Sequence, residues 1–442
     1  MTVCEVRLWD TMVGAVTWEA GVANFAYTPS FRKSGIEIAP LQMPLGPGVF
    51  RFPELARTSF HGLPGLLADS LPDKFGNAVI DAWLAQNGRA ADKMNPVQQL
   101  AYTGSRGMGA LEYLPALESG AKPNEKIEVA DLVRLSNEVL SERRDFTTTL
   151  ESDSRERALV SLLSVGSSAG GARAKAVVAW NRKTGEMRSG QTDSPEDYEH
   201  WLIKFDGVLQ NSDKELADPM GFGRIEYAYS EMAKRAGIEM SDCFLLEENG
   251  RSHFMTRRFD RFLGVGPIEK APRVEKLHVT TLGGMAHLDF NLAGAHSYER
   301  AFDVLRALRL PMADREELFR RMLFNVLARN QDDHVKNIAF TMAKSGTWSL
   351  APAYDLTFAY NPKGAWTSQH QMSIHGKRDH FDATDLDAIA KYAGLARGRG
   401  RALESEVREA LSMWLSFAAA AGVPDLWAQQ IEGLMRARCE AL

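Results

Sequence analysis

Residues 330–337 read NQDDHVKN, and residues 351–356 read APAYDL. In the first motif, Asp332 and Asn337 are five positions apart, which is the spacing of the catalytic-loop aspartate and the metal-binding asparagine in protein kinases. In the second motif, Asp355 stands eighteen residues beyond Asn337, where such enzymes carry a further metal-binding aspartate. The two motifs together predict a phosphoryl-transfer site on a kinase-like fold.

Each of these residue types suits one step of that chemistry. Asp332 would orient an attacking hydroxyl group and accept its proton. The amide oxygen of Asn337 and the carboxylate of Asp355 would bind Mg²⁺, which prefers oxygen ligands and keeps several of its waters. Loops rich in Asp and Asn also form ordinary turns and caps, but the second aspartate at a matching distance favours the metal site. Asp333 is the alternative base, although only Asp332 has the five-residue spacing to Asn337.

A kinase site also needs a lysine on a strand to neutralise the phosphates of ATP. Lys204 interrupts WLIKF, an otherwise apolar run at 201–205. It is therefore either the ATP lysine or a lysine on an edge strand that extends its amine into solvent. On the helix that follows, Glu226 is either the ion-pair partner of this lysine or a solvated residue near the helix start.

A glycine-rich stretch, SSAGGARAK at 167–175, lies between two predicted strands and precedes Lys204. Ser168, Gly170 and Gly171 belong to it, and backbone N–H groups of such a loop can cover phosphates. Glycine-rich turns between strands are common, so the order of the elements carries more weight than the loop alone. That order is strand, glycine-rich loop, strand, strand with lysine, and helix with glutamate.

Hydrophobic periodicity gives the wider plan of the chain. Short alternating stretches with turn residues fill residues 3–52, and helical spacing begins after Asp73. Further strands are expected at 159–165, 176–180 and 201–205 and in a hairpin at 243–256, whose turn is Asn249-Gly250. Helices are expected at 127–142, 221–236, 297–309, 313–329, 384–394, 403–421 and 425–438, and 330–382 is expected to be irregular.

This pattern predicts an α+β, bilobal, protein-kinase-like fold with a β-rich N-terminal part and a mainly helical C-terminal lobe. We expect a β-rich unit with helices at 1–150. A β region like a kinase N-lobe, with the glycine-rich loop and the ATP lysine, should follow at 151–270. The helical C-lobe with the catalytic and metal-binding loops should occupy 271–442.

Composition excludes several other classes. The chain has 442 residues and a formal net charge of −5, which argues against a surface that binds nucleic acid throughout. Its three cysteines are far apart and odd in number, so we expect no disulfide framework and a cytoplasmic location. The most apolar charge-free run, 410–424, is too short to span a membrane and is expected to be a buried helix. No HExxH cluster or GxSxG motif supports zinc or acyl-transfer chemistry.

Seven motifs, in one order along nearly the whole chain, resemble the HipA family of bacterial toxin–antitoxin kinases. They are GLLADSLPDKFGN (65–77), SAGGARAK (168–175), LIKF (202–205), RRFDR (257–261), QDDHVKN (331–337), PAYDL (352–356) and MSIHGKR (372–378). The resemblance implies a HipA-type N-terminal domain, serine/threonine kinase activity with ATP and Mg²⁺, and self-phosphorylation. It also implies a small helix-turn-helix antitoxin, similar to HipB, through which DNA is bound indirectly.

Site roles follow from the same resemblance. It implies that Asp332 is the base, that Asn337 and Asp355 are metal ligands, and that Lys204 holds the phosphates of ATP. Phe259, within RRFDR, would lie at the hinge that binds adenine. The nucleotide site is expected to include further residues from these motifs, namely Ser168, Gly170, Gly171, Glu226, His334, Lys336 and Tyr354. Ser168 would also be the self-phosphorylated residue.

The sequence departs from the family pattern at several places. Ser164 and Ser167 lie close to Ser168, Asp333 replaces a small residue, and His375 stands where many relatives have Asn. The resemblance implies a protein substrate of the translation machinery, such as a translation factor or an aminoacyl-tRNA synthetase, and no membrane partner. Two alternatives stay open: a small-molecule or lipid kinase of the same fold, and an interaction subunit that represses transcription with its antitoxin.

Overall fold

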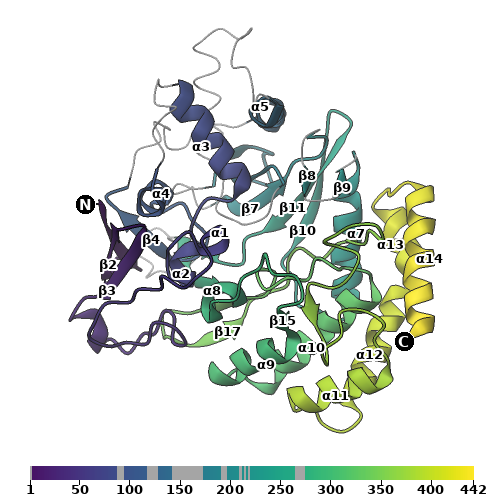
Figure 1. Cartoon of the computed structure of the whole chain (residues 1–442). Helices are drawn as coiled ribbons and strands as arrows, with labels where there is room; N and C mark the ends of the chain where they lie inside the picture. Colours follow the sequence, from purple (N-terminus) through teal and green to yellow (C-terminus); the bar gives the residue numbers. More distant parts are fainter. Residues whose placement is uncertain are drawn as a thin grey trace.

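The computed structural model describes residues 2–86, 94–116, 128–141, 173–190, 197–208, 212–213, 216–217, 220–263 and 274–442. Most of the described strands lie before residue 264, with helices between them, and helices dominate the region after residue 297. In Figure 1 the N-terminal strands lie on one side of the molecule and the last helices lie on the opposite side. The predicted α+β plan is therefore confirmed. Among the described helices, none is both long and apolar enough to cross a membrane.

The N-terminal unit is built on a four-stranded antiparallel sheet in the order β3-β2-β1-β4. Its strands are β1 (Thr2–Leu8), β2 (Thr11–Glu19), β3 (Val22–Tyr27) and β4 (Leu111–Leu114). Alternate residues of β1 are buried because the sheet has one covered face. The helical elements of this unit are η1 (Phe31–Lys33), α1 (Arg57–Phe60), α2 (Gly65–Ala68) and α4 (Pro96–Thr103).

A five-stranded sheet in the order β10-β11-β7-β5-β6 follows. Its strands are β5 (Lys175–Trp180), β6 (Met187–Ser189), β7 (Glu199–Lys204), β10 (Cys243–Glu248) and β11 (Arg251–Arg257). Trp201 and Ile203 of β7 share a core with α3 (Lys74–Gln86) and α5 (Val129–Ser141). Two helices from the first expected domain thus pack on strands of the second. Because alternate strand residues face opposite ways, Lys204 points to the other face, towards α7 (Phe222–Arg235).

The helical lobe has one large apolar core that also includes the buried face of α7. The prediction for α7 is confirmed, with Ile225, Tyr229, Met232 and Ala236 buried and Gly237 in the left-handed conformation after its end. The other helices of this lobe are α8 (Leu282–Ala286), α9 (Tyr298–Ala307), α10 (Met312–Leu327), α11 (Ala383–Ala393), α12 (Arg399–Leu411), α13 (Trp414–Ala420) and α14 (Asp425–Ala441).

Two expectations for the C-terminal part are wrong. The region 403–421 is not one helix, because α12 ends at Leu411 and α13 begins at Trp414. The break lets Trp414 pack edge-on against Tyr229 and leaves Met413 and Leu415 about 40% exposed. Nor is 330–382 irregular throughout, because it contains β16 (Ala339–Met342), β17 (Trp348–Leu350) and β18 (Met372–Ser373).

The remaining strands are short connectors. Strands β16 and β17 form a three-stranded sheet with β14 (His278–Thr281), and β18 pairs with β15 (His296–Ser297). The first of these sheets supports both motif loops, since the first loop ends at β16 and the second begins after β17. The other short pairs are β12 (Arg261–Leu263) with β13 (Val274–Lys276) and β8 (Ser212–Asp213) with β9 (Leu216–Ala217).

The N-terminal unit joins the helical lobe where α2 meets α8. A side chain at Gly65 would come within 2.5 Å of the carbonyl oxygen of Gly284, so the two backbones are in direct contact. Beside them, the buried carboxylate of Asp69 accepts hydrogen bonds from the backbone N–H of Thr281 (2.8 Å) and from the hydroxyls of Thr281 (3.0 Å) and Thr280 (3.2 Å). Burial raises the pKa of Asp69, and these donors and Lys336 oppose that rise.

Candidate active site

Lys204, at the end of β7, contacts two carboxylates. Its Nζ lies 2.5 Å from Oε1 of Glu226 and also contacts Oδ1 of Asp355. Strand β7 lies between β11 and β5, so the edge-strand alternative for Lys204 is wrong. Glu226 is only 2% exposed, which excludes the alternative that it is solvated. Burial opposes the positive charge, but Asp355 and Glu226 outweigh that effect and raise the pKa of Lys204.

Asp355 follows β17 in a left-handed backbone conformation, with φ of 54°. Burial opposes its ionisation, but Lys204 and Lys175 outweigh that effect and lower its pKa. Lys175 and Lys204 are partners in the register of β5 and β7, which places both amines near this carboxylate. The lowered pKa favours the ionised carboxylate, the form in which Asp355 would bind a metal.

The loop at 330–337 holds the side chain of Asn337 in one orientation. The side-chain amide nitrogen of Asn337 donates a hydrogen bond to the carbonyl oxygen of Asp332 (2.8 Å), which directs its amide oxygen away from that bond. The residues immediately before the two proposed ligands are also joined, because the hydroxyl of Tyr354 donates to the carbonyl oxygen of Lys336 (2.6 Å). This bond ties the loop of Asn337 to the loop of Asp355.

The choice between the two adjacent aspartates is clear from their surroundings. The side chain of Asp333 is 1% exposed and accepts hydrogen bonds from the Tyr298 hydroxyl (2.9 Å), from Nδ1 of His370 (2.9 Å) and from the backbone N–H of Gln371 (2.8 Å). It is a buried structural group. The side chain of Asp332 is 30% exposed, which leaves it as the candidate base.

His334 and Lys336 gather around Phe290. The ring of His334 lies 5.9 Å from the Phe290 ring, and Nζ of Lys336 lies 4.4 Å above that ring. Nε2 of His334 is 4.0 Å from Oδ1 of Asp332, so this histidine lies beside the candidate base. The other side of the site is formed by Tyr354, whose ring stacks on that of Phe259 at 6.1 Å.

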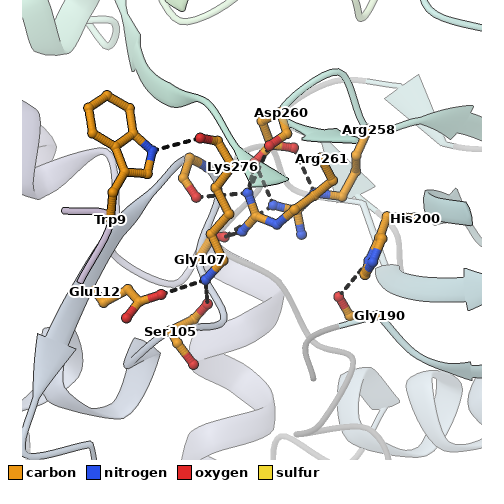
Figure 2. Close-up of polar contacts among 11 residues, drawn as sticks. Trp9, Ser105, Gly107, Glu112, Gly190, His200, Arg258, Asp260, Arg261 and Lys276 are labelled. Atoms are coloured by element: carbon orange, nitrogen blue, oxygen red, sulfur yellow. Dashed lines mark hydrogen bonds and ion pairs between the residues drawn. The ribbon is translucent and has the colours of Figure 1, made fainter. Parts of the chain in front are cut away.

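The segment that carries Phe259 is held by a buried ion network, shown in Figure 2. The carboxylate of Asp260 accepts hydrogen bonds from Arg258 (2.6 and 2.8 Å) and Arg261 (2.7 Å) and from the backbone N–H of Gly109 (2.7 Å). Both arginines also donate to the carbonyl oxygen of Gly107. Burial opposes the charge of Asp260, but the two guanidinium groups hold its pKa well below its usual range.

A second set of contacts extends this junction to the N-terminal sheet (Figure 2). Nζ of Lys276 lies 2.6 Å from the carboxylate of Glu112. The backbone carbonyl oxygen of Lys276 accepts a hydrogen bond of 2.7 Å from the indole N–H of Trp9. On the other side of the network, burial together with Arg258 and Arg261 lowers the pKa of His200 to about 4. The predicted hinge is therefore attached to the N-terminal unit as well as to the five-stranded sheet.

Residues 167–172 of the glycine-rich stretch lie outside the described residues, and these include Ser167, Ser168, Gly170 and Gly171; Ser164 lies outside them too. The last residues of the stretch, 173–175, are held firmly. Lys175 lies 3.0 Å from the carboxylate of Asp73, with both side chains 4% exposed, and Nη1 of Arg173 lies 3.5 Å from Oε2 of Glu226. Sequence reasoning missed the contact of Lys175 with Asp73. The signal that could have found it is their opposite charge in two family motifs that follow one another along the chain.

The donor set fits magnesium better than a transition metal. Among the described residues, no group of three or more His, Cys, Asp or Glu side chains is placed to hold a metal ion. The carboxylate of Asp355 and the amide oxygen of Asn337 would supply hard oxygen ligands, which is the small protein contribution that Mg²⁺ takes when phosphates and waters complete its shell.

Comparisons with known proteins identify the family and the fold. The HipA-like C-terminal domain matches residues 167–419, and the HipA N-terminal domain matches residues 4–114. No curated protein matches the chain. A chain of the solved Shewanella oneidensis MR-1 complex of HipA, HipB and operator DNA is similar in structure, with a TM-score of 0.69 at 18% identity over 99% of this chain and 96% of that one. The fold is thus that of HipA.

A weaker similarity links the chain to the Helicobacter pylori proinflammatory kinase CtkA, with a TM-score of 0.37 at 10% identity over 57% of this chain and 90% of that chain. The two family domains between them cover the N-terminal sheet, the five-stranded sheet and most of the helical lobe. Because the C-terminal domain alone spans more than half of the residues, this protein belongs to the HipA family.

Proposed function

We propose that this protein is an ATP- and Mg²⁺-dependent serine/threonine protein kinase that acts as the toxin of a toxin–antitoxin pair. The observation that carries the proposal is the position of Lys204, which contacts both Glu226 and Asp355. A strand lysine held by a helix glutamate beside a metal-binding aspartate is the arrangement that protein kinases use for the phosphates of ATP.

Each described residue has one task in this proposal. Lys204 neutralises the phosphates, and Glu226 keeps the lysine in place from the face opposite the α3–α5 core. Asp332 orients the substrate hydroxyl and accepts its proton as the γ-phosphoryl group is transferred. Asn337 and Asp355 would hold Mg²⁺, which would supply charge neutralisation at the phosphates. The hinge segment at Phe259, whose ring stacks on that of Tyr354, would bind the adenine.

The partners follow from family membership. The Shewanella complex contains HipB and operator DNA, and we propose a helix-turn-helix antitoxin of that kind for this protein, with DNA bound through it. The protein substrate is proposed to belong to the translation machinery. Ser168 in the glycine-rich loop is the proposed site of self-phosphorylation, with Ser164 and Ser167 as neighbouring candidates.

Incubation with γ-labelled ATP and Mg²⁺ tests the proposal. The wild type should transfer label to itself and to proteins of a cell extract, and Asp332→Asn should bind ATP but transfer little. Asp387→Asn is the matched control, because Asp387 is 59% exposed and pairs only with Arg401 among the ion pairs of the described residues. If the wild type binds ATP but transfers no label, the result would support the alternative of an interaction subunit. If label appears only in small molecules or lipids, the result would support the alternative of a small-molecule or lipid kinase.

A further inference from the structure

The candidate base is itself held by a tryptophan. The indole N–H of Trp366 donates a hydrogen bond of 2.6 Å to Oδ1 of Asp332. Trp366 is half-buried and lies eleven residues after Asp355, in the segment that connects the metal-binding loop to β18. A hydrogen bond to a carboxylate at this distance is charge-assisted and stronger than one between neutral groups.

The backbone at Trp366 is fixed by Gln371. The side-chain nitrogen of Gln371 is shared among the carbonyl oxygens of Trp366, Gln369 (3.1 Å) and Gln331 (3.2 Å). The backbone N–H of Gln371 donates to the buried carboxylate of Asp333 (2.8 Å). Gln371 therefore ties the tryptophan to the residues on either side of the candidate base, through its side-chain amide to Gln331 and through its backbone N–H to Asp333.

The same segment is attached to the catalytic loop nearer its start. Two backbone hydrogen bonds of 3.0 Å make this attachment. The N–H of Gln331 donates to the carbonyl oxygen of Ala359, and the N–H of Ala359 donates to the carbonyl oxygen of Arg329. The guanidinium of Arg329 lies 4.5 Å above the ring of Tyr360. With two attachments to residues 329–333, the segment holds the indole at a defined place over Asp332.

We propose that Trp366 is a positioning residue for phosphoryl transfer, which orients the carboxylate of Asp332 through the indole N–H. An aspartate carboxylate turns easily about its last bond, and its base function depends on the direction in which an oxygen faces the hydroxyl. A donor on a rigid bicyclic ring, whose own backbone is fixed by Gln371, removes that freedom. This inference rests on the proposed function, because it takes Asp332 as the base.

The contact can be tested without any activity. The protein has nine tryptophans, and their indole N–H signals can be recorded after ¹⁵N labelling. Trp366→Phe identifies the signal of Trp366 by its loss. In Asp332→Asn that signal should move upfield by more than the other eight, because the acceptor is no longer charged. A Trp366 signal unchanged by Asp332→Asn would overturn the proposal.

Kinetics test the role. Trp366→Phe should lower kcat by about tenfold or more, as expected for the loss of one hydrogen bond to a charged group, with KM for ATP changed by less than about twofold. Trp348→Phe is the matched control, because its indole N–H donates to the carbonyl oxygen of Glu37 (3.3 Å), and its kcat should equal that of the wild type. Gln371→Glu, which keeps the tryptophan and removes the donating amide, should also lower kcat.

The outcomes separate the two proposals. If the wild type transfers phosphate and Trp366→Phe has the same kcat or a higher one, the positioning role of Trp366 is overturned and the proposed function is not. A rise in KM for ATP that accounts for the whole loss would also overturn it. A wild type that transfers no phosphate refutes the proposed function, and the positioning role falls with it.

Discussion

Replacing Asp260 by Asn should destabilise the protein far more than the same Asp-to-Asn substitution does at an exposed position. Asp260 is completely buried, and Arg258 and Arg261 beside it are less than 10% exposed. With one carboxylate and two guanidinium groups the cluster has a net charge of +1, and the substitution raises it to +2 without admitting water. The new NH₂ group would also face N–H donors that now point at an oxygen.

The magnitude follows from these contacts. Four N–H groups, from Arg258, Arg261 and Gly109, converge on the two oxygens of Asp260. At least one of them loses its acceptor, and one hydrogen bond to a charged group contributes about 1.5–3 kcal/mol. Leaving buried charges uncompensated brings the expected loss in the free energy of unfolding to about 3–5 kcal/mol.

Urea unfolding measures this loss. At an m-value of about 3 kcal/mol/M, the midpoint should fall by about 1–1.7 M for Asp260→Asn. Asp242→Asn is the matched control, because Asp242 pairs with Arg257 at 3.5 Å and both side chains are more than 40% exposed. Exposed pairs contribute little, so the control should unfold at the wild-type midpoint. A midpoint shift below about 0.3 M for Asp260→Asn would refute the reasoning.

Three further predictions concern the site and its surroundings. Asp355→Ala should reduce the rise in melting temperature that Mg-ATP produces in the wild type, because a ligand stabilises only the state that binds it. A thermal-shift assay measures this rise, and an equal rise in both proteins would show that Asp355 is not part of the nucleotide site. Wild-type protein made in cells should carry phosphate at Ser168 and the Asp332→Asn variant none, as read by intact-mass and peptide spectrometry; unmodified, ATP-competent wild type would contradict this. The pKa of His200 is lowered to about 4 in the folded state, below its ordinary value near 6.5, so the unfolded state binds the extra proton. Stability should therefore decrease as pH falls from about 7 towards 4, and His200→Gln should flatten that decrease in the urea midpoint.

The parts of the fold with a strong local signal were predictable. The amphipathic pattern of α7 gave its buried face and its end at Gly237, and Asn249-Gly250 gave the turn of the β10–β11 hairpin, with φ of 50° and 74°. Strands β16 and β17 were missed because they are only four and three residues long. All residues of β16 are buried, so the strand shows no alternation of apolar and polar residues.

The site divides in the same way. The spacing of Asp332, Asn337 and Asp355 reflects two loops next to one small sheet, the first ending at β16 and the second beginning after β17, so local sequence was enough to propose them. The contact of Trp366 with Asp332 spans 34 residues through a segment with no periodicity, and nothing local to either residue indicates it. Single-sequence reasoning also left Asp333 open as the base, because only the tertiary fold shows its three buried donors.

The contact between α2 and α8 decides how this protein can be divided for experiments. At Gly65 and Gly284 the backbones of the N-terminal unit and the helical lobe are too close for any side chain. A fragment that begins at the glycine-rich loop would therefore lose the partner of α8 and leave Thr280 and Thr281 without the carboxylate of Asp69. Residues 167–442 cloned by themselves should yield insoluble or unfolded material, so screens for inhibitors or substrates need the N-terminal unit as well.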